Sequence, residues 1–126
     1  LTSQEETKTP MSPTPSELLA AIRFVETGGE DDPNNATGEA GELGCMQITE
    51  PAWLDAVNHD PEIGGKFQDV TCPEYSAQIF WAYMDRYAPR KGWRDRVRIW
   101  NGGPYGDKKK ATLPYLRKVE DALRNL

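Results

Sequence analysis

Apolar residues recur at helical spacing near the start of the chain, at Leu18, Leu19, Ile22 and Val25. At roughly 100° per residue these positions form one stripe, which predicts an amphipathic helix. Thr14 and Glu17 are spaced as a capping box, and Pro15 suits the first helical position. The Gly28-Gly29 pair can end the helix. We therefore expect a helix that begins at Pro15 and ends near Glu26.

Two further helices are expected in the middle of the chain. A short one covers residues 51–57, and a longer one carries an apolar, aromatic-rich face up to Tyr87. Thr71 and Glu74 are spaced as a capping box for the longer helix. Between the first helix and these two, the polar segment 30–44 is longer than most connections, which predicts a short hairpin or a long loop.

Two more helices are expected near the end of the chain. The first begins at Trp93 and ends in Asn101-Gly102-Gly103-Pro104, and a closing helix begins at Thr112 and carries Leu116, Val119 and Leu123. No run of residues predicts a strand with comparable strength. The pattern therefore predicts a small, mainly α-helical domain over residues 14–126, preceded by a polar, proline-containing flexible arm at residues 1–13.

Glu26 falls inside the apolar stripe of the first helix, about one turn beyond Ile22. A carboxyl group on such a face points toward a core or a cleft, where burial disfavours the ionised form. A carboxylic acid that stays protonated near neutral pH can act as a general acid. The alternative is a helix-end glutamate that faces solvent or pairs with an arginine.

Composition limits the partners of the chain. It has 126 residues, 37% of them hydrophobic, and a formal net charge of −5. This charge argues against nucleic acid or an anionic membrane as the main partner, and no apolar run approaches the roughly 20 residues of a membrane span. Lys108, Lys109 and Lys110 are interpreted as a solvated turn, with specific anion binding as the alternative. We expect a monomer without membrane insertion.

Two cysteines, Cys45 and Cys72, are too few to define a disulfide scaffold, and whether they form one bridge is left open. They have no metal-like spacing with the single histidine, His59, which we expect at the surface. No metal site and no cofactor are therefore expected. The chain begins without methionine and without an apolar signal segment, which fits a processed secreted protein or a trimmed chain.

Six motifs follow one another in an order that resembles the invertebrate-type (destabilase-like) lysozymes and their bacterial relatives, within the lysozyme superfamily. Any one of them is weak, but six in the order of the family are specific, and they span nearly everything after residue 16. The motifs are Glu26-Thr27-Gly28-Gly29, Gly38-Glu39-Ala40-Gly41-Glu42-Leu43-Gly44-Cys45-Met46-Gln47-Ile48, Trp53-Leu54-Asp55, Tyr83-Met84-Asp85-Arg86-Tyr87, Arg98-Ile99-Trp100-Asn101-Gly102-Gly103-Pro104-Tyr105-Gly106 and Thr112-Leu113-Pro114-Tyr115-Leu116-Arg117-Lys118-Val119.

The resemblance implies a secreted, extracellular or periplasmic lysozyme that cleaves peptidoglycan, with two catalytic carboxylates. Glu26 matches the acid of the family, and Glu39 lies where relatives carry the second carboxylate, usually an aspartate. Glycosidic cleavage needs one protonated carboxyl and one ionised carboxylate, and a polar loop suits the ionised one. Glu42 and Asp31 compete with Glu39 for this role, and a merely solvated Glu39 is also possible.

Four residues are expected to bind the substrate, which is peptidoglycan or a chitin-like polysaccharide. Gln47 and Asn101 carry amides that suit amino sugars, Gly102 lets the backbone approach a saccharide, and Tyr115 could orient Glu26 or the substrate. The alternative for both amides is that they satisfy local backbone groups.

The chain also departs from the pattern of the family. Animal members are rich in cysteine, Trp100 replaces a histidine, and Cys45-Met46 replaces an aromatic pair before Gln47. The Met-Gln pair resembles lytic transglycosylases and goose-type lysozymes. Two alternatives to the lysozyme therefore stay open: a transglycosylase that uses Glu26 alone, and a non-catalytic glycan-binding module.

Overall fold

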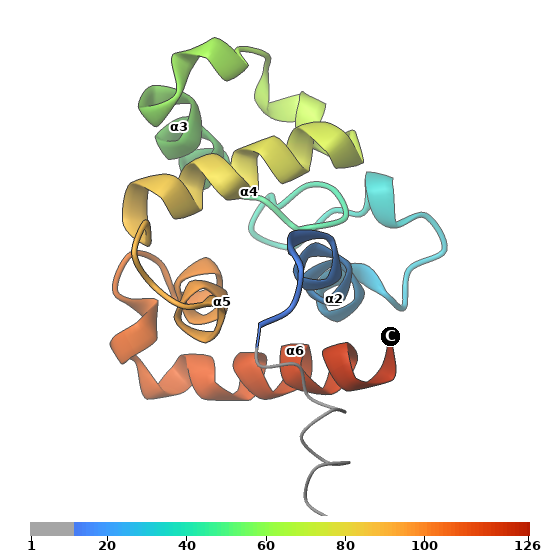
Figure 1. The fold of residues 1–126 in the computed structure, drawn as a ribbon. Coiled ribbons are helices and arrows are strands. Elements are labelled where there is room, and N and C mark those ends of the chain that lie inside the picture. The colour runs from blue at the N-terminus through green and yellow to red at the C-terminus, as the bar shows by residue number, and fades with distance from the viewer. Residues whose placement is uncertain (1–11) are drawn as a thin grey trace, which may run out of the picture. The chain divides into compact units, whose positions relative to one another are not determined.

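The computed structural model describes residues 12–126, so residues 1–11 of the expected arm lie outside the described residues. Its α-helices are α2 (Pro15–Thr27), α3 (Glu50–His59), α4 (Pro73–Tyr87), α5 (Trp93–Gly102) and α6 (Leu113–Asn125) (Figure 1). Short 3-10 helices join them: η1 (Pro33–Asn35), η2 (Pro61–Ile63), η3 (Phe67–Thr71), η4 (Gly106–Lys108) and η5 (Lys110–Thr112). Residues 12–126 contain isolated β-bridges but no strand, which confirms the mainly α prediction.

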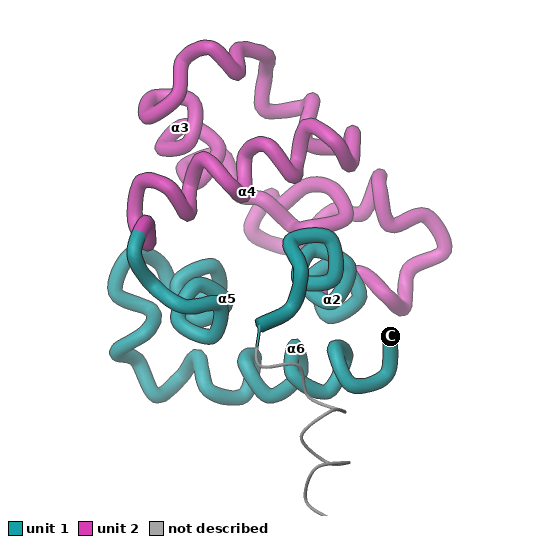
Figure 2. The backbone as a smooth tube through the Cα atoms, in the orientation of Figure 1, with its two compact units in different colours: residues 1–25, 90–126 teal, residues 26–89 magenta. Residues whose placement is uncertain are grey.

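The chain divides into two compact units, which Figure 2 draws in different colours. Unit 2 is Glu26–Pro89. Unit 1 combines the described residues up to Val25 with Arg90–Leu126. Helix α2 crosses the boundary, so Glu26 and Thr27 are the first residues of unit 2.

The first helix begins as the sequence predicts. The backbone N–H of Thr14 donates to Glu17 Oε1 at 2.8 Å, and the N–H of Glu17 donates to Thr14 Oγ1 at 3.2 Å. This reciprocal pair satisfies two N–H groups that the first turn of a helix leaves without partners. The apolar stripe is also present, because Leu18, Leu19 and Ile22 are buried.

Unit 2 is built on the packing of α3 against α4, with η3 beside α4. Helix α4 buries Ile79, Phe80 and Met84 almost completely. Each such side chain contributes about 1.5–3 kcal/mol when it is removed from water. Burial, together with the charge of Asp55 and the neighbouring Tyr87, raises the pKa of Tyr83 to about 12.

The predicted capping box of α4 is wrong. The helix begins at Pro73 with Cys72 as its N-cap, and the Thr71 hydroxyl donates to the carbonyl of Gln68 at 3.0 Å inside η3. Glu74 accepts a hydrogen bond from the Cys72 thiol at 3.3 Å. Proline is favoured at the first helical position, so Pro73 sets the start one residue later than the Thr–Glu spacing implied.

The polar segment after α2 contains a rudimentary hairpin, as expected. Leu43 pairs with Thr37 on one side and with Ile48 on the other. Leu43 and Ile48 exchange both backbone hydrogen bonds, each at 3.0 Å, and Gly38 N–H donates to the carbonyl of Glu42 at 2.9 Å. Of the two forms expected for this segment, the structure therefore contains the hairpin, which is made of two tight turns at residues 38–42 and 43–48.

Unit 1 is built on the packing of α5 against α6. Val97 and Ile99 of α5 and Val119 of α6 are completely buried. None of the helices described here is long and apolar enough to cross a membrane.

Thr112, the expected start of the closing helix, is the N-cap of α6, but its side chain does not cap the helix. Its hydroxyl instead lies within hydrogen-bond distance of the carbonyls of Gly106, at 2.8 Å, and Lys109, at 2.7 Å. The side chain of Thr112 therefore holds the segment before α6 together.

An ion pair connects the segment before α5 to η4. Lys91 Nζ donates to Asp107 Oδ2 at 2.7 Å, and the Asp107 side chain is only 8% exposed. This hydrogen bond lowers the pKa of Asp107 and raises the pKa of Lys91. A carboxyl with a lowered pKa stabilises the fold above its unfolded pKa, near 3.8, and this contribution is lost as the pH falls through the lower folded pKa. Lys91 stabilises the fold below 10.5, and this contribution is lost as the pH rises through its raised pKa.

We expect Asp107→Asn to lower the melting temperature at pH 7 and the loss to shrink as the pH falls below about 4. Thermal unfolding of the parent and the variant from pH 3 to pH 7 measures this difference. Lys91→Gln and the double variant complete a cycle, in which the double variant should be about as stable as either single variant. A loss of equal size at pH 3 and pH 7 would contradict the assigned pair.

Candidate functional site

Glu26 lies in the last turn of α2 and is half-buried. The next residue, Thr27, is 3% exposed, and its hydroxyl donates to the carbonyl of Cys45 at 2.9 Å. The carbonyl of Thr27 accepts a hydrogen bond from Glu30 N–H at 3.0 Å, which turns the chain out of the helix. The end of α2 is thus attached to the 43–48 turn, and the Glu26 backbone is held beside this attachment.

Glu39 lies at the tip of the 38–42 turn and is exposed. Gly41 N–H donates to the carbonyl of Gly38 at 3.1 Å, and Gly41 has a φ of 86°, in the region that favours glycine. Within residues 12–126 the Glu39 carboxylate has no hydrogen-bond partner. The turn therefore presents Glu39 to solvent as an unengaged carboxylate.

Glu42, the main competitor of Glu39, has a different environment. It is half-buried, and its Oε1 accepts a hydrogen bond from Ala40 N–H at 2.8 Å. The same carboxylate lies over Gly38, where an added Cβ would come within 2.7 Å of the carboxyl carbon. Glu42 therefore stabilises the turn that carries Glu39. Asp31 is exposed in the polar segment before this turn.

The side-chain amide of Gln47 donates hydrogen bonds to nearby backbone carbonyls, as the alternative interpretation of the sequence predicted. Gln47 Nε2 donates to the carbonyls of Gly44 at 2.9 Å and Ala36 at 3.3 Å. The Gln47 amide oxygen lies near Gly38, 2.8 Å from the position of an added Cβ. Gln47 has a φ of 52°, the only positive φ among the non-glycine residues of the described chain. The structure thus brings Gln47 and Glu42 together on the two turns.

The remaining predicted site residues belong to unit 1. Asn101 is exposed near the end of α5, and its amide has no hydrogen-bond partner in the described part of the chain. Gly102 is half-buried, its carbonyl accepts a hydrogen bond from Lys109 Nζ at 2.8 Å, and an added Cβ would strike Thr112. Tyr115 is half-buried on α6. In unit 1, the side-chain amide of Asn101, which has no hydrogen-bond partner within residues 12–126, is therefore next to Gly102, whose position Lys109 and Thr112 fix.

Two residues of the site were not predicted from the sequence. Thr27 attaches the end of α2 to the 43–48 turn through a hydrogen bond to Cys45, 18 positions further along the chain. Helical spacing predicts contacts within a helix and cannot predict this one. Thr112 was predicted only as a helix start, although its hydroxyl also accepts a hydrogen bond from Arg98 Nε at 2.8 Å. The motif that begins with Thr112-Leu113 indicated that this position is important, but it did not indicate which residues Thr112 contacts.

The two cysteines are not bonded to each other. Cys45 is buried with its sulfur 3.8 Å from Ser76 Oγ, and Cys72 is exposed. His59 is the last residue of α3, two residues beyond its predicted end, and bonds to Asp85 Oδ2 at 2.8 Å on the surface. No group of three or more His, Cys, Asp or Glu side chains in residues 12–126 is arranged to hold a metal ion.

An apolar groove of about 530 Å³ lies elsewhere in unit 1, between α2 and α6. Its lining includes Phe24 and Leu126, which are 59% and 67% exposed. None of the predicted site residues lines this groove, so it does not help to place the predicted chemistry.

No family model matches the chain, and no curated protein sequence matches it. Among solved structures, the crystal structure of the Tapes japonica lysozyme is similar, with a TM-score of 0.70 and 25% sequence identity. The match covers 86% of this chain and 92% of that chain. The chain therefore has a lysozyme-like fold.

The lysozyme-like fold agrees with the motif order found in the sequence. The similarity of fold does not assign the chain to the invertebrate-type group, and that assignment stays a prediction. The roles of Glu26, Glu39 and the four substrate-binding residues also stay predictions, because a likeness of fold does not assign a role to a side chain.

Glycines 41 and 44 provide a test of the two turns. Gly44 has a φ of 83°, and an added Cβ would collide with the carbonyl oxygen of Val70, whereas Gly41 has a similar φ and open space around it. We expect Gly41→Ala to cost about 1 kcal/mol of stability, from backbone strain alone. Gly44→Ala should cost about 3 kcal/mol, because the collision adds to the strain. Urea unfolding of both variants measures the difference, and equal losses would contradict the close approach of Gly44 to Val70.

Proposed function

We propose that the chain is a lysozyme-type glycoside hydrolase that cleaves the β-1,4 bond between N-acetylmuramic acid and N-acetylglucosamine in bacterial peptidoglycan. The observation that carries this proposal is the lysozyme-like fold, which extends over most of the chain. The six ordered motifs, with Glu26 in the last turn of α2, give further support. Since peptidoglycan lies outside the cytoplasm, the proposal includes secretion and a cell-wall-degrading, antimicrobial role.

Glu26 is the proposed general acid. Cleavage of a glycosidic bond requires a proton on the leaving oxygen, and a carboxyl that is partly removed from water is suited to carry it. Glu26 is half-buried, and the neighbouring Thr27–Cys45 hydrogen bond restrains the backbone that carries it. A restrained backbone limits how far the carboxyl can move from a productive position.

Glu39 is the proposed second carboxylate, acting as nucleophile or as electrostatic partner of the oxocarbenium-like centre. Its exposure on the turn suits an ionised group, whereas one oxygen of Glu42 is occupied by the N–H of Ala40. The unengaged amide of Asn101 and the backbone of Gly102 are proposed to bind the acetamido and hydroxyl groups of the sugars, with Gln47 and Tyr115 in supporting roles.

A lytic transglycosylase is the second candidate, and one observation favours it. The Glu39 carboxylate is held by no partner within residues 12–126, so it is less constrained than a nucleophile usually is. A transglycosylase needs only Glu26, which protonates the leaving oxygen and then accepts the proton of a substrate hydroxyl as that oxygen attacks the sugar. The product is an anhydro sugar, and no water is consumed.

We expect Glu26→Gln to keep the fold and to lower the rate of peptidoglycan cleavage by a factor on the order of a thousand. General acid help typically contributes 10² to 10⁴, and an amide of the same size cannot supply the proton. Clearing of a cell-wall suspension measures the rate, and circular dichroism checks the fold. If the variant clears the suspension at the parent rate, Glu26 is not the acid.

We expect Glu39→Gln to abolish hydrolysis while binding of the polymer survives. Glu42→Gln should retain most activity, because the amide oxygen can still accept the hydrogen bond from Ala40 N–H. Asp31→Asn, which lies outside the turn, is a second control.

Mass spectrometry of the digest separates the candidates, because hydrolysis gives reducing ends and transglycosylation gives anhydro ends. Full activity of Glu39→Gln with anhydro products would replace the two-carboxylate mechanism with the transglycosylase. Binding by the parent protein without any cleavage would instead indicate a non-catalytic glycan-binding module.

A further inference from the structure

Charge is distributed very unevenly along this chain. Residues 26–89, which form unit 2, carry 13 acidic and two basic side chains. The described residues of unit 1, 12–25 and 90–126, carry five acidic and 12 basic side chains. In a chain with a net charge of −5, the described residues of unit 1 thus carry a net charge of +7.

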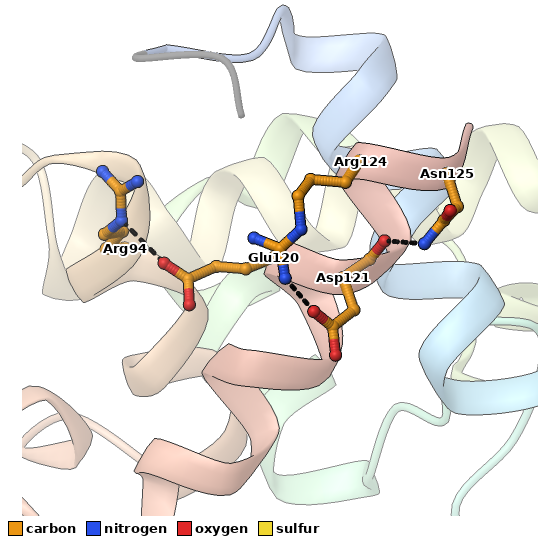
Figure 3. A network of polar contacts seen from close by, with 5 residues as sticks. All are labelled: Arg94, Glu120, Asp121, Arg124 and Asn125. Atoms are coloured by element: carbon orange, nitrogen blue, oxygen red, sulfur yellow. Dashed lines mark hydrogen bonds and ion pairs between the residues drawn. The ribbon is translucent and has the colours of Figure 1, made fainter. Parts of the chain in front are cut away.

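Some cations of unit 1 have carboxylate partners. Lys91 pairs with Asp107 at 2.7 Å and Arg94 with Glu120 at 3.0 Å. Arg124 pairs with Asp121 on α6, and Figure 3 shows this pair beside the Arg94–Glu120 pair. The charges of these three cations are balanced by carboxylates of the same unit.

A second group of cations in unit 1 is held differently. We call Arg98, Lys108, Lys109 and Lys110 the cationic cluster. Arg98 donates through Nε to Thr112 Oγ1 at 2.8 Å and through Nη2 to the carbonyl of Lys109 at 2.9 Å. These acceptors, and the Gly102 carbonyl that receives Lys109 Nζ, are neutral, so they fix the side chains without cancelling their charge.

Lys108 and Lys110 complete the cluster from the two short helices before α6. Both are exposed, and neither ammonium group forms an ion pair with a residue in the range 12–126. Asp107 is the nearest acid in sequence, but Lys91 already occupies its Oδ2. Lys108 also helps to lower the pKa of Asp107, so this carboxylate balances part of its charge. The loop still carries an excess of positive charge on residues 98 and 108–110.

The cationic cluster adjoins the proposed sugar-binding residues. Lys109 Nζ bonds to the carbonyl of Gly102, which directly follows the unengaged amide of Asn101. An anionic group that binds here while Asn101 contacts a sugar lies close enough to belong to the same polymer. Muramic acid residues of peptidoglycan carry peptide stems that end in carboxylates, whereas chitin carries no charge.

We propose that the cationic cluster binds the peptide-stem carboxylates of the glycan strand whose sugars contact Asn101 and Gly102. This inference rests on the proposed function and adds to it a site that favours peptidoglycan over a neutral amino-sugar polymer. The cationic cluster is small and local, so it suits the discrete carboxylates of peptide stems, although the whole chain has a net charge of −5. Screening over about 8 Å in physiological salt lets a local cluster act despite this net charge.

The test compares binding to two forms of one polymer. Peptidoglycan is stripped of phosphate polymers, and half of it is amidated so that its carboxylates become neutral. Co-sedimentation measures the affinity of the Glu26→Gln chain for each form, since this background leaves the polymer intact. Lys108→Gln/Lys110→Gln is added to that background, and Lys118→Gln/Arg124→Gln is the control with the same change of charge in unit 1.

We expect the Glu26→Gln chain to bind the untreated polymer about tenfold tighter than the amidated form, and the Lys108/Lys110 variant to lose most of this preference. Exposed ion pairs typically contribute about 1.4- to fivefold each, so two of them account for a change of this size. The control variant should keep the preference, and 0.5 M salt should weaken it in every chain that shows it.

Three results would overturn the inference: equal binding of the two polymer forms, an unchanged preference in the Lys108/Lys110 variant, or an equal loss in the control. Binding only to walls that retain phosphate polymers would also overturn it in favour of a phosphate ligand. The proposed function fails separately, when the parent chain binds the polymer without cleaving it. If the chain binds neither form, both proposals fail.

Discussion

The hydrogen bond from Thr27 to the carbonyl of Cys45 is the constraint on which the arrangement of the site in unit 2 depends. It joins the end of a helix to a turn 18 positions further along the chain, and both of its residues are buried. A buried carbonyl without a partner costs about 1–3 kcal/mol, so this bond favours one position of the helix end over others. Gly44 permits the turn to lie there because its missing Cβ leaves room for the Val70 carbonyl.

Backbone strain in unit 2 lies next to this bond, at Gln47. A non-glycine residue in the left-handed region costs about 1–2 kcal/mol, and Gln47 has a φ of 52°. Its two side-chain hydrogen bonds to backbone carbonyls, at 2.9 and 3.3 Å, offset part of this cost. They also fix the amide oxygen over Gly38, at the base of the turn that presents Glu39. These hydrogen bonds therefore hold Gln47 in a strained conformation, and strained residues often lie near functional sites.

Local patterns in the sequence predicted the helices well but predicted the start of one helix wrongly. The Thr14–Glu17 capping box was correct because both partners lie within one turn. The equally spaced Thr71–Glu74 pair failed because Pro73 between them restricts its own φ and fixes the helix start. The Thr–Glu spacing favours a helix start at residue 72, whereas the fixed φ of Pro73 favours a start at residue 73. The spacing alone does not show which preference is stronger.

The carboxylates of the candidate site show the same limit. Glu39 and Glu42 are three residues apart in one polar segment, and composition gives them equal claims to a catalytic role. Only the turn separates them, because it directs the Glu42 carboxylate to the N–H of Ala40 and leaves Glu39 exposed. The motif order identified a lysozyme-like fold, yet the support of Gly102 by Lys109 and Thr112 depends on contacts seven and ten residues apart that no motif describes.

The charge pattern shows why the net charge of a whole chain is a weak guide to its partners. The value of −5 argued against nucleic acid or an anionic membrane as the main partner, but it is the sum of a strongly acidic and a basic unit. At physiological ionic strength a bound group responds mainly to charges within about 8 Å, so the local balance matters more than the total. In unit 1 that balance depends on which cations have carboxylate partners. Lys91 and Arg94 have them, whereas Arg98 and Lys109 are held by neutral oxygens that do not cancel their charge.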